Sequence, residues 1–294
     1  MNDLKKNNKR SKPDWLKVKL KFNDNYRKVN DLVQTHSLNT VCEEARCPNI
    51  YECWDAKTAT IMILGDICTR SCGFCSVKTG KPKLVDKDEP IRVAQAVNKM
   101  DLDHIVITSV DRDDLKNDYG ASIWVRTIEE IKILSPDCSV EVLTPDFKAH
   151  EPSIQKVLNA KPDIFSHNIE TVKRISKLVR PNSDCDRTEK VLKMSVESGL
   201  VTKTGLMVGL GETDQEVLET MRIVADMGVS IFNIGQYLQP TIKHLPVDRY
   251  VHPDLFDLYK KEGLKYGFKV VESGPLVRSS YHAASQVNKL NGIA

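Results

Sequence analysis

Long apolar runs are missing from this sequence. The longest, Ile61 to Leu64, has four residues, whereas a transmembrane helix takes roughly 20. No apolar segment follows the Lys- and Asn-rich start, Met1 to Arg10, so a secretory signal is not expected. The formal net charge of +3 is close to neutral for 294 residues and gives no support to a nucleic-acid or anionic-membrane partner. We therefore expect a cytoplasmic globular protein that binds neither nucleic acid nor membrane.

Disulfide bonds are also not expected. The chain has eight cysteines but no recognisable export signal, which indicates a reducing compartment. Clustered cysteines in such a compartment are typical of metal or redox sites, and six of the eight lie between Cys42 and Cys75. The basic stretch from Lys5 to Lys21 fits a solvated arm, and the alternative is a surface that meets an acidic protein partner.

Short apolar runs alternate with amphipathic stretches after the cysteines, which predicts strands and helices in turn. The six predicted strands are Thr60–Leu64, His104–Ile107, Ser139–Val142, Asp163–Phe165, Val201–Met207 and Ile231–Ile234. Six strand–helix units in series predict an α/β fold with a parallel sheet. Because a full barrel has eight units, we favour an open, partial (β/α)6 barrel of the TIM type, and periodicity leaves a doubly wound sheet as the alternative. We divide the chain into an N-terminal extension (1–57), the partial barrel (58–240) and a C-terminal extension (241–294).

Three cysteines follow the first predicted strand directly. Cys68, Cys72 and Cys75 (the barrel triad) have the spacing C-x₃-C-x₂-C. Three thiolates on one short loop can hold three irons of a [4Fe-4S] cluster and leave the fourth iron open for a ligand. A structural zinc site is the alternative, but it takes four closed ligands, and residues 41–98 contain no histidine. The pattern therefore favours an iron–sulfur cluster.

The barrel triad, with Phe74 just before its last cysteine, resembles the motif of the radical S-adenosylmethionine superfamily. The resemblance implies that the open iron binds S-adenosylmethionine (SAM). It also implies that electron transfer from the cluster cleaves SAM to methionine and a 5′-deoxyadenosyl radical, which abstracts hydrogen from unactivated carbon.

Three further cysteines precede the predicted barrel. Cys42, Cys47 and Cys53 (the N-terminal triad) have the spacing C-x₄-C-x₅-C. The remaining cysteines, Cys138 and Cys185, lie alone in unrelated segments and fit packed thiols rather than ligands. The two triads together resemble the lipoyl synthase family, from about residue 12 to the C-terminal end. The other segments that carry the resemblance are Val41–Asn49, Glu52–Trp54, His167–Thr171, Met207–Thr213, Gly235–Pro240 and Gly274–Tyr281.

The resemblance implies two [4Fe-4S] clusters. The barrel triad would hold the cluster that binds SAM, and the N-terminal triad would hold an auxiliary cluster. In the family a serine of an Arg-Ser-Ser-Tyr motif is the fourth ligand of the auxiliary cluster. That serine is Ser279 or Ser280 here, and we favour Ser280. A serine oxygen is a harder iron ligand than thiolate, so the iron that it binds should be the labile one.

The implied reaction is the insertion of two sulfur atoms into an octanoyl group on a lysine of a lipoyl-carrier domain, giving the (dihydro)lipoyl cofactor. Two SAM-derived radicals would abstract hydrogen at C6 and then at C8, with the auxiliary cluster as sulfur donor. The implied partners are the octanoylated carrier domain, an electron donor and a carrier that repairs the consumed cluster. No catalytic residue is expected beyond the cluster ligands. The alternatives are another sulfur-inserting radical enzyme and a non-catalytic zinc or iron–sulfur scaffold.

Polar or small residues near the ends of the later strands are candidates for SAM contacts. They are Asn168, Glu170, Arg180, Gly209, Gly211 and Gln236. Carboxylate and amide groups suit ribose hydroxyls and an amino group, an arginine suits a carboxylate, and glycines let backbone N–H groups approach a ligand. Structural capping and a tight strand-to-helix turn are the alternatives.

The chain departs from the family pattern at two places. The segment Leu115 to Gly120 lacks a Gly-Gly pair that is common there, and Cys185 stands where the family usually has tyrosine. We expect both positions near active-site loops, where they would affect substrate positioning.

Overall fold

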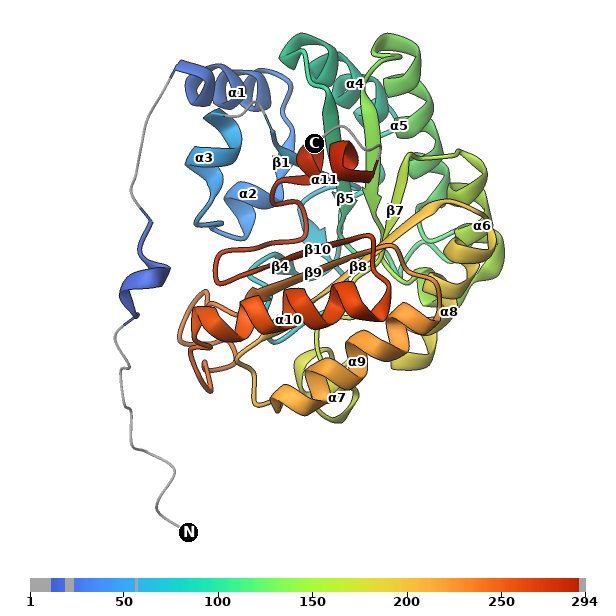
Figure 1. Ribbon diagram of the computed structural model, residues 1–294. Helices are drawn as coiled ribbons and strands as arrows, with labels where there is room; N and C mark the ends of the chain where they lie inside the picture. Colours follow the sequence, from blue (N-terminus) through green and yellow to red (C-terminus); the bar gives the residue numbers. More distant parts are fainter. Residues whose placement is uncertain (1–11, 19–23, 56–57, 291–294) are drawn as a thin grey trace.

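An open, eight-stranded sheet forms the centre of the computed structural model, which describes residues 12–18, 24–55 and 58–290. In spatial order the strands are β1 (Asn39–Thr40), β2 (Thr60–Ile63), β5 (His104–Ser109), β6 (Ser139–Leu143), β7 (Ile164–Ser166), β8 (Val201–Val208), β9 (Ile231–Gln236) and β10 (Val270–Gly274). Neighbours from β2 to β10 are parallel, and β1 pairs with β2 in the antiparallel sense. Because β1 and β10 remain as free edges, the curved sheet does not close (Figure 1).

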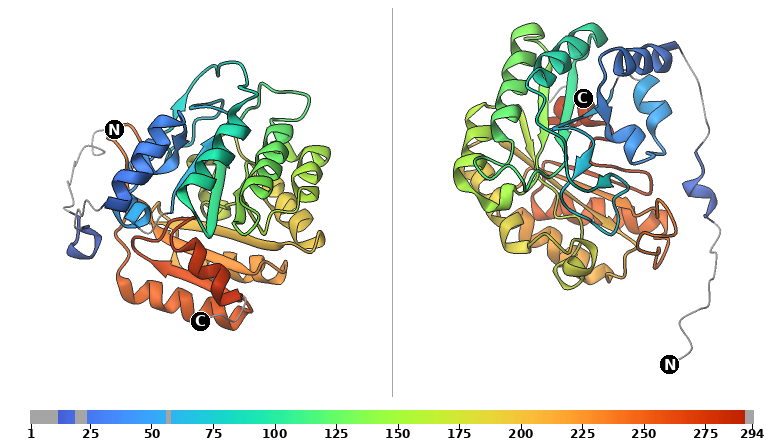
Figure 2. Two further views of the ribbon diagram at one scale, coloured as in Figure 1. Left: turned by 90° about the horizontal axis from the view of Figure 1, so that it is seen from above. Right: turned by 180° about the vertical axis from the view of Figure 1, so that it is seen from behind.

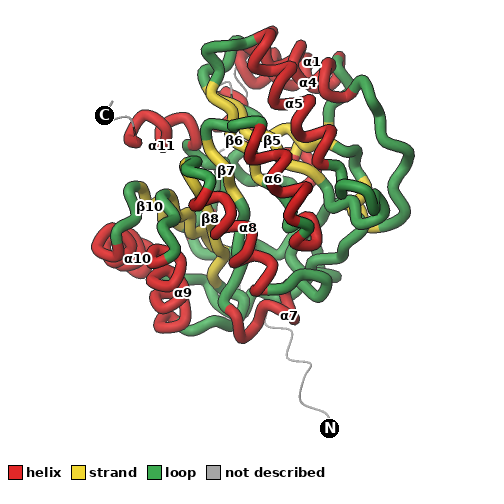
Figure 3. The backbone as a smooth tube through the Cα atoms, turned by 90° about the vertical axis from the view of Figure 1, so that its right-hand side faces the viewer, coloured by secondary structure: helices red, strands yellow, loops and turns green. Residues whose placement is uncertain are grey.

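Helices cover the outside of this sheet (Figures 1 and 3). They are α4 (Glu89–Met100), α5 (Ala121–Leu134), α6 (Glu151–Asn159), α8 (Cys185–Glu197), α9 (Asp214–Asp226) and α10 (Pro253–Tyr266). Each turns an apolar stripe toward the strands, as Val93, Val97 and Met100 of α4 show. The capping box of α9, in which the Thr213 and Glu216 side chains bond to each other's backbone N–H groups, sets where that helix begins.

Shorter elements complete the described chain. They are η1 (Asp14–Leu16), α1 (Asp24–Thr35), α2 (Val41–Glu44), α3 (Ile50–Asp55), β3 (Ile67–Cys68), β4 (Lys78–Thr79), η2 (Phe147–Ala149), η3 (Lys173–Ile175), α7 (Ser176–Val179) and α11 (Ala283–Leu290). Strands β3 and β4 pair only with each other, and they carry the loop of the barrel triad. No helix in the described part of the chain combines the length and the apolar character needed to cross a membrane.

The prediction of an open, partial α/β barrel is confirmed, and all six predicted strands are present as β2 and β5 to β9. Two strands of this sheet were missed. The antiparallel β1 has only two residues, and β10 adds a seventh parallel strand beside β9. The α10–β10 unit lies within the predicted C-terminal extension, and it continues the barrel pattern. Of the basic stretch at residues 5–21, only residues 12–18 lie within the described residues.

The α1–α3 segment and a segment near the C-terminal end meet beside the barrel. Figures 1 and 2 show the α1–α3 segment and the C-terminal segment on the same side of the sheet. The Asn49 side chain donates a hydrogen bond to the Leu276 carbonyl (2.7 Å), and the Tyr281 hydroxyl donates one to the Glu52 carboxylate (3.0 Å). These contacts bring residues 276–281 onto the segment that carries the N-terminal triad.

Candidate active site

A cavity of about 530 Å³ opens at the carboxyl ends of the parallel strands. Its lining includes the whole barrel triad, together with Cys42 and Cys47 of the N-terminal triad. The segments that follow β5, β6 and β7 supply polar residues to it, and β8 and β9 supply mostly apolar ones. Ligand sites in α/β sheets and barrels form at this edge, because the loops that end the strands converge there.

The loop of the barrel triad is fixed by backbone hydrogen bonds. The Sγ atom of Cys68 accepts bonds from the backbone N–H groups of Arg70 and Asp111, both at 3.4 Å. The Thr69 N–H donates to the Asp111 carbonyl at 3.0 Å, which ties the loop to the segment after β5. Such N–H···S bonds are one of the means by which a protein tunes an iron–sulfur cluster.

Burial disfavours free thiolates at both triads. It raises the pKa of Cys68 to about 11 and that of Cys72 to about 12, although the nearby Arg180 acts to lower the latter. Burial likewise raises the pKa of Cys42 to about 11 and the pKa of Cys53 even further. Without metal, these cysteines are neutral thiols, and bound metal supplies the positive charge that thiolates need here.

The donor set fits iron–sulfur clusters better than single metal ions. Within residues 12–18, 24–55 and 58–290, no three His, Cys, Asp or Glu side chains lie close enough together to hold one ion. In a cluster each thiolate binds its own iron, so the sulfur atoms of the ligands stand further apart than around a mononuclear zinc. The barrel triad lines the large cavity, so a cluster there would face a space with room for further ligands.

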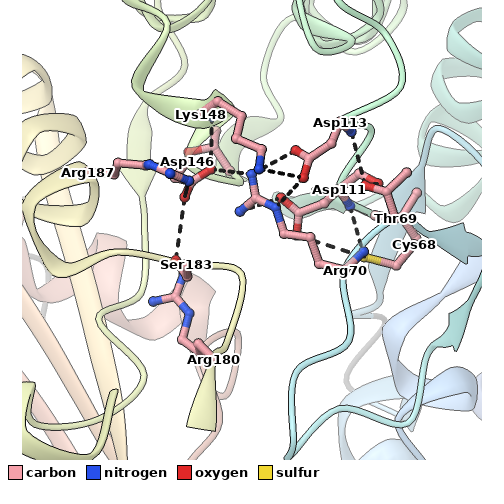
Figure 4. A network of polar contacts seen from close by, with 12 residues as sticks. Cys68, Thr69, Arg70, Asp111, Asp113, Asp146, Lys148, Arg180, Ser183 and Arg187 are labelled. Atoms are coloured by element: carbon pink, nitrogen blue, oxygen red, sulfur yellow. Dashed lines mark hydrogen bonds and ion pairs between the residues drawn. The ribbon is translucent and has the colours of Figure 1, made fainter. Parts of the chain in front are cut away.

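A buried ionic network holds the barrel-triad loop against the strand ends (Figure 4). Arg70 lies between two cysteines of the triad, and its side chain is only 3% exposed. Its guanidinium forms a bidentate pair with Asp113 at 2.8 and 2.9 Å. It also pairs with Asp146 at 2.6 Å and with Asp111 at 3.1 Å. One arginine therefore joins the cluster loop to the segments after β5 and β6.

The N-terminal triad surrounds a second, small cavity of about 20 Å³. All three of its cysteines line this cavity, together with Thr60 at the start of β2 and Ser280 from a distant part of the chain, among a few other residues. The Thr60 hydroxyl donates a hydrogen bond of 2.6 Å to the Ser280 hydroxyl oxygen. A serine oxygen and three sulfurs thus face one space.

The two neighbouring serines lie in different surroundings. Ser280 lines the small cavity, whereas Ser279 does not. The Ser279 hydroxyl instead accepts a hydrogen bond from the Asn168 side chain at 2.7 Å, at the end of β7. The geometry therefore distinguishes two residues between which the sequence left a choice.

Three of the predicted SAM-contact residues, Asn168, Glu170 and Arg180, lie together on the large cavity. Glu170 has φ of 65°, which is uncommon for a residue other than glycine. Backbone hydrogen bonds to β8 hold it in this conformation. Burial raises the pKa of Glu170, and the charge of Arg180 acts to lower it. No carboxylate pairs with Arg180 within the described ranges, and its guanidinium donates to the carbonyls of residues 168 and 169.

The other three predicted SAM-contact residues, Gly209, Gly211 and Gln236, either lie outside the cavity or use their polar groups within the protein. Gly209 and Gly211 do not line the cavity, and the buried Glu212 carboxylate accepts hydrogen bonds from the N–H groups of Gly209 (2.7 Å) and Leu210 (2.9 Å). Gln236 lines the cavity, but its side-chain amide is engaged by backbone groups that include the Arg249 carbonyl and the Val251 N–H. Their contacts to SAM stay a prediction that this geometry does not favour.

Sequence reasoning did not single out His167, which also lines the cavity. Its Nδ1 lies 2.9 Å from the Thr144 carbonyl and donates to it, which leaves Nε2 as an acceptor without a partner among the residues described. Burial lowers the pKa of His167 to about 4, so the ring is neutral. A buried acceptor of this kind suits a hydrogen-bond donor on a ligand.

The two departures from the family pattern lie away from the cavity. None of residues 115–120 lines it, and Asp118 accepts hydrogen bonds from the N–H groups of Gly120 and Ser122 at the start of α5. Cys185 is the first residue of α8 and also lies outside the cavity lining. The expectation that these positions shape the site finds no support in the geometry.

Comparison with known proteins identifies the family of this chain. Residues 62–224 match the radical SAM superfamily, and residues 1–47 match the N-terminal domain of lipoyl synthase. Lipoyl synthase from Rubrobacter xylanophilus is 54% identical over 277 residues, which are 94% of this chain and 86% of that protein. Lipoyl synthase from Flavobacterium johnsoniae is 51% identical, covering 94% and 96%. The chain belongs to the lipoyl synthase family. As a radical SAM enzyme of this family, it takes SAM and a [4Fe-4S] cluster as cofactors.

Solved structures similar to this lipoyl synthase family member support the fold. SuiB from Streptococcus suis bound to S-adenosylmethionine aligns with a TM-score of 0.58 at 12% identity, covering 78% of this chain and 54% of that one. Methylornithine synthase (PylB) aligns with a TM-score of 0.52 at 12% identity, covering 83% and 82%. At these identities the likeness concerns the partial barrel alone.

Proposed function

We propose that the chain inserts two sulfur atoms, at C6 and C8, into a protein-bound octanoyl-lysine, giving the (dihydro)lipoyl cofactor. The observation that carries this proposal is that the two triads line adjoining cavities that share several lining residues. The large cavity is lined by the barrel triad and by Cys42 and Cys47, and the small cavity beside it is lined by the N-terminal triad and Ser280. A saturated acyl chain in the large cavity would lie between the two sets of ligands.

The two triads would hold different clusters. Cys68, Cys72 and Cys75 would hold the [4Fe-4S] cluster whose open iron binds SAM, and Cys42, Cys47, Cys53 and Ser280 would hold an auxiliary [4Fe-4S] cluster. When bound, SAM at the first cluster would supply a 5′-deoxyadenosyl radical, and the auxiliary cluster would supply sulfide. The location of Ser280 on the small cavity, with Ser279 bonded to Asn168, supports Ser280 as the fourth ligand.

The protein's own residues would bind and orient the reactants. Arg180, which has no carboxylate partner among the residues described, suits the carboxylate of SAM, and Glu170 and Asn168 suit its amino and hydroxyl groups. Met62 and Leu206 are among the apolar side chains that line the cavity. Apolar walls suit an octanoyl chain, and they exclude water from a site where a carbon radical forms.

The proposed reaction sets requirements on partners and location. It takes an octanoylated lipoyl-carrier domain as substrate, an electron donor for SAM cleavage and a carrier that restores the consumed cluster. The proposed cluster ligands must stay reduced to bind iron, so the proposal includes a reducing, cytoplasmic location. The division of the chain at residues 57 and 240 remains our interpretation, with ligands of the auxiliary cluster on both extensions.

The test is anaerobic incubation of the reconstituted enzyme with an octanoyl-lysine peptide, SAM and a strong reductant. Mass spectrometry should show two sulfur atoms added to the peptide. Ser280→Ala should still form 5′-deoxyadenosine but should lose most sulfur insertion, whereas the matched Ser279→Ala should keep its auxiliary cluster. A wild-type chain that forms 5′-deoxyadenosine but adds no sulfur would refute the proposed function and leave the radical SAM assignment intact.

A further inference from the structure

Arg278 lies at the boundary between the two cavities and lines both of them. It precedes the two serines, so the segment that brings Ser280 to the N-terminal triad also brings a guanidinium. One of its nitrogens, Nη1, donates to the Val277 carbonyl at 2.6 Å. The same nitrogen is 3.3 Å from the place where a Cβ on Gly235 would stand, so it packs against β9.

Arg278 has no carboxylate within ion-pair distance among the residues that the structure describes. Two of the buried arginines differ. Arg70 pairs with three aspartates, and Arg112 pairs with Asp114 at 2.8 Å. Arg278 is only partly exposed, and a cation that is partly withdrawn from water gains from a compensating anion. Since the protein supplies no carboxylate here, the compensating anion is expected to be a bound group.

The neighbouring group that can become negatively charged is the N-terminal triad, whose cysteines turn into thiolates when they bind metal. Burial acts to lower the pKa of Arg278, and the charge of Cys47 acts in the opposite direction. Arg278 acts in turn to lower the pKa of Cys47, against the effect of burial. A guanidinium stays protonated in proteins, so Arg278 is a permanent positive charge beside one proposed ligand.

We propose that Arg278 is a positioning residue for the auxiliary cluster, whose positive charge compensates the cluster's negative charge and makes the cluster easier to reduce. The inference rests on the proposed function, in which three thiolates and a serine oxygen hold that cluster. Such a cluster carries net negative charge, and each reduction adds one more. A fixed cation at its edge therefore favours the reduced form, since charge near a cluster is one determinant of its potential.

Arg180 provides the matched contrast. Like Arg278, it lines the large cavity without a carboxylate partner among the described residues, but it lies beside Cys72 of the barrel triad. Its charge should act on the SAM-binding cluster and hardly at all on the auxiliary one. The pair therefore allows a comparison between a cation near one triad and a cation near the other.

The experiment uses the full-length chain with Cys68, Cys72 and Cys75 changed to alanine, so that only the auxiliary cluster reports. Arg278→Gln, Arg278→Lys and the control Arg180→Gln are made in this parent. Each is reconstituted anaerobically, assayed for iron and sulfide, and titrated potentiometrically with detection by electron paramagnetic resonance. Arg278→Gln should lower the equilibrium constant for reduction of the auxiliary cluster by about tenfold. For a one-electron couple this is a shift of about 59 mV to more negative potential. The reduction potential of Arg278→Lys should stay close to that of the parent, and the potential of Arg180→Gln should equal that of the parent.

The outcomes separate the possible failures. Full cluster content with an unchanged potential in Arg278→Gln would overturn the inference and leave the proposed function standing. If Arg278→Gln loses the cluster, retention in Arg278→Lys supports the role of charge, and equal loss in both variants overturns it. A parent chain that reconstitutes no cluster would contradict the proposed function itself, and with it the inference.

Discussion

Replacing Arg70 with methionine should destabilise the protein strongly. Arg70 is 3% exposed, and its partner Asp146 is completely buried, at 2.6 Å. Removing one member of a buried ion pair leaves an uncompensated charge, which costs about 3–5 kcal/mol of unfolding free energy. The folded-to-unfolded ratio should therefore fall by roughly two to four powers of ten. Arg126→Met is the control, since the Arg126–Glu130 pair is exposed, 3.6 Å long and worth about 0–1 kcal/mol.

The same change should alter the pH dependence of stability. Burial alone would raise the pKa of Asp146, but the hydrogen bond and charge of Arg70 outweigh burial and lower it to about 2. In the wild type this contribution to stability is complete above the unfolded pKa of 3.8 and is lost only as the pH falls through about 2. Without Arg70 the buried carboxyl favours its protonated form. The loss of unfolding free energy in Arg70→Met, relative to the wild type, should therefore become smaller as the pH falls from about 7 to about 5.

Anaerobic urea unfolding, followed by circular dichroism, measures the unfolding free energy of each variant at each pH. The compared chains should have equal iron content, so that cluster loss does not contribute. A loss in Arg70→Met no larger than that in Arg126→Met would refute the reasoning. So would a deficit that widens on mild acidification. Either result would mean that the network in Figure 4 is not the buried anchor that its geometry indicates.

Two further changes test the packing beside the site and the start of a helix. A Cβ on Gly235 would stand 2.0 Å from the Val277 carbonyl oxygen, so Gly235→Ala should displace the segment that leads to Ser280. The change should cost about 1–3 kcal/mol of unfolding free energy and lower the iron content of the auxiliary cluster. Gly80→Ala is the control, because its nearest contact would be an ordinary 3.5 Å; equal iron loss in both would contradict the packing argument. Thr213→Ala removes the capping box of α9 and should cost about 1 kcal/mol in thermal unfolding, and no change would show that the cap is dispensable.

The sequence predicted the central fold well because strands β2 and β5 to β9 carry β-branched apolar runs between amphipathic stretches. It missed β10, whose register comes from pairing with β9 rather than from its own composition. It also missed α1, a mostly polar helix of which only Val29 and Val33 are buried. A local sequence pattern does not show against which distant segment a strand or helix will pack.

The site was predictable where a motif names its own residues, as the two triads do. The resemblance left Ser279 and Ser280 as candidates with Ser280 favoured, and the structure separates their positions, because Ser280 lines the small cavity and Ser279 bonds to Asn168. Arg70 lies inside the barrel-triad motif, but its three aspartate partners come together only in the folded chain. Gly209 looked like a ligand contact, yet the Glu212 carboxylate already occupies its N–H group.

The central claim is that the chain holds two different clusters on two cysteine triads. Iron and sulfide analysis of the anaerobically reconstituted protein tests it most directly, together with two variants in which one triad or the other is replaced by alanine. The wild type should contain about eight irons and about eight sulfides per chain, and each variant about four of each. Only the variant that keeps Cys68, Cys72 and Cys75 should form 5′-deoxyadenosine from SAM. Zinc in place of iron, or a wild type that contains only about four irons, would contradict the account.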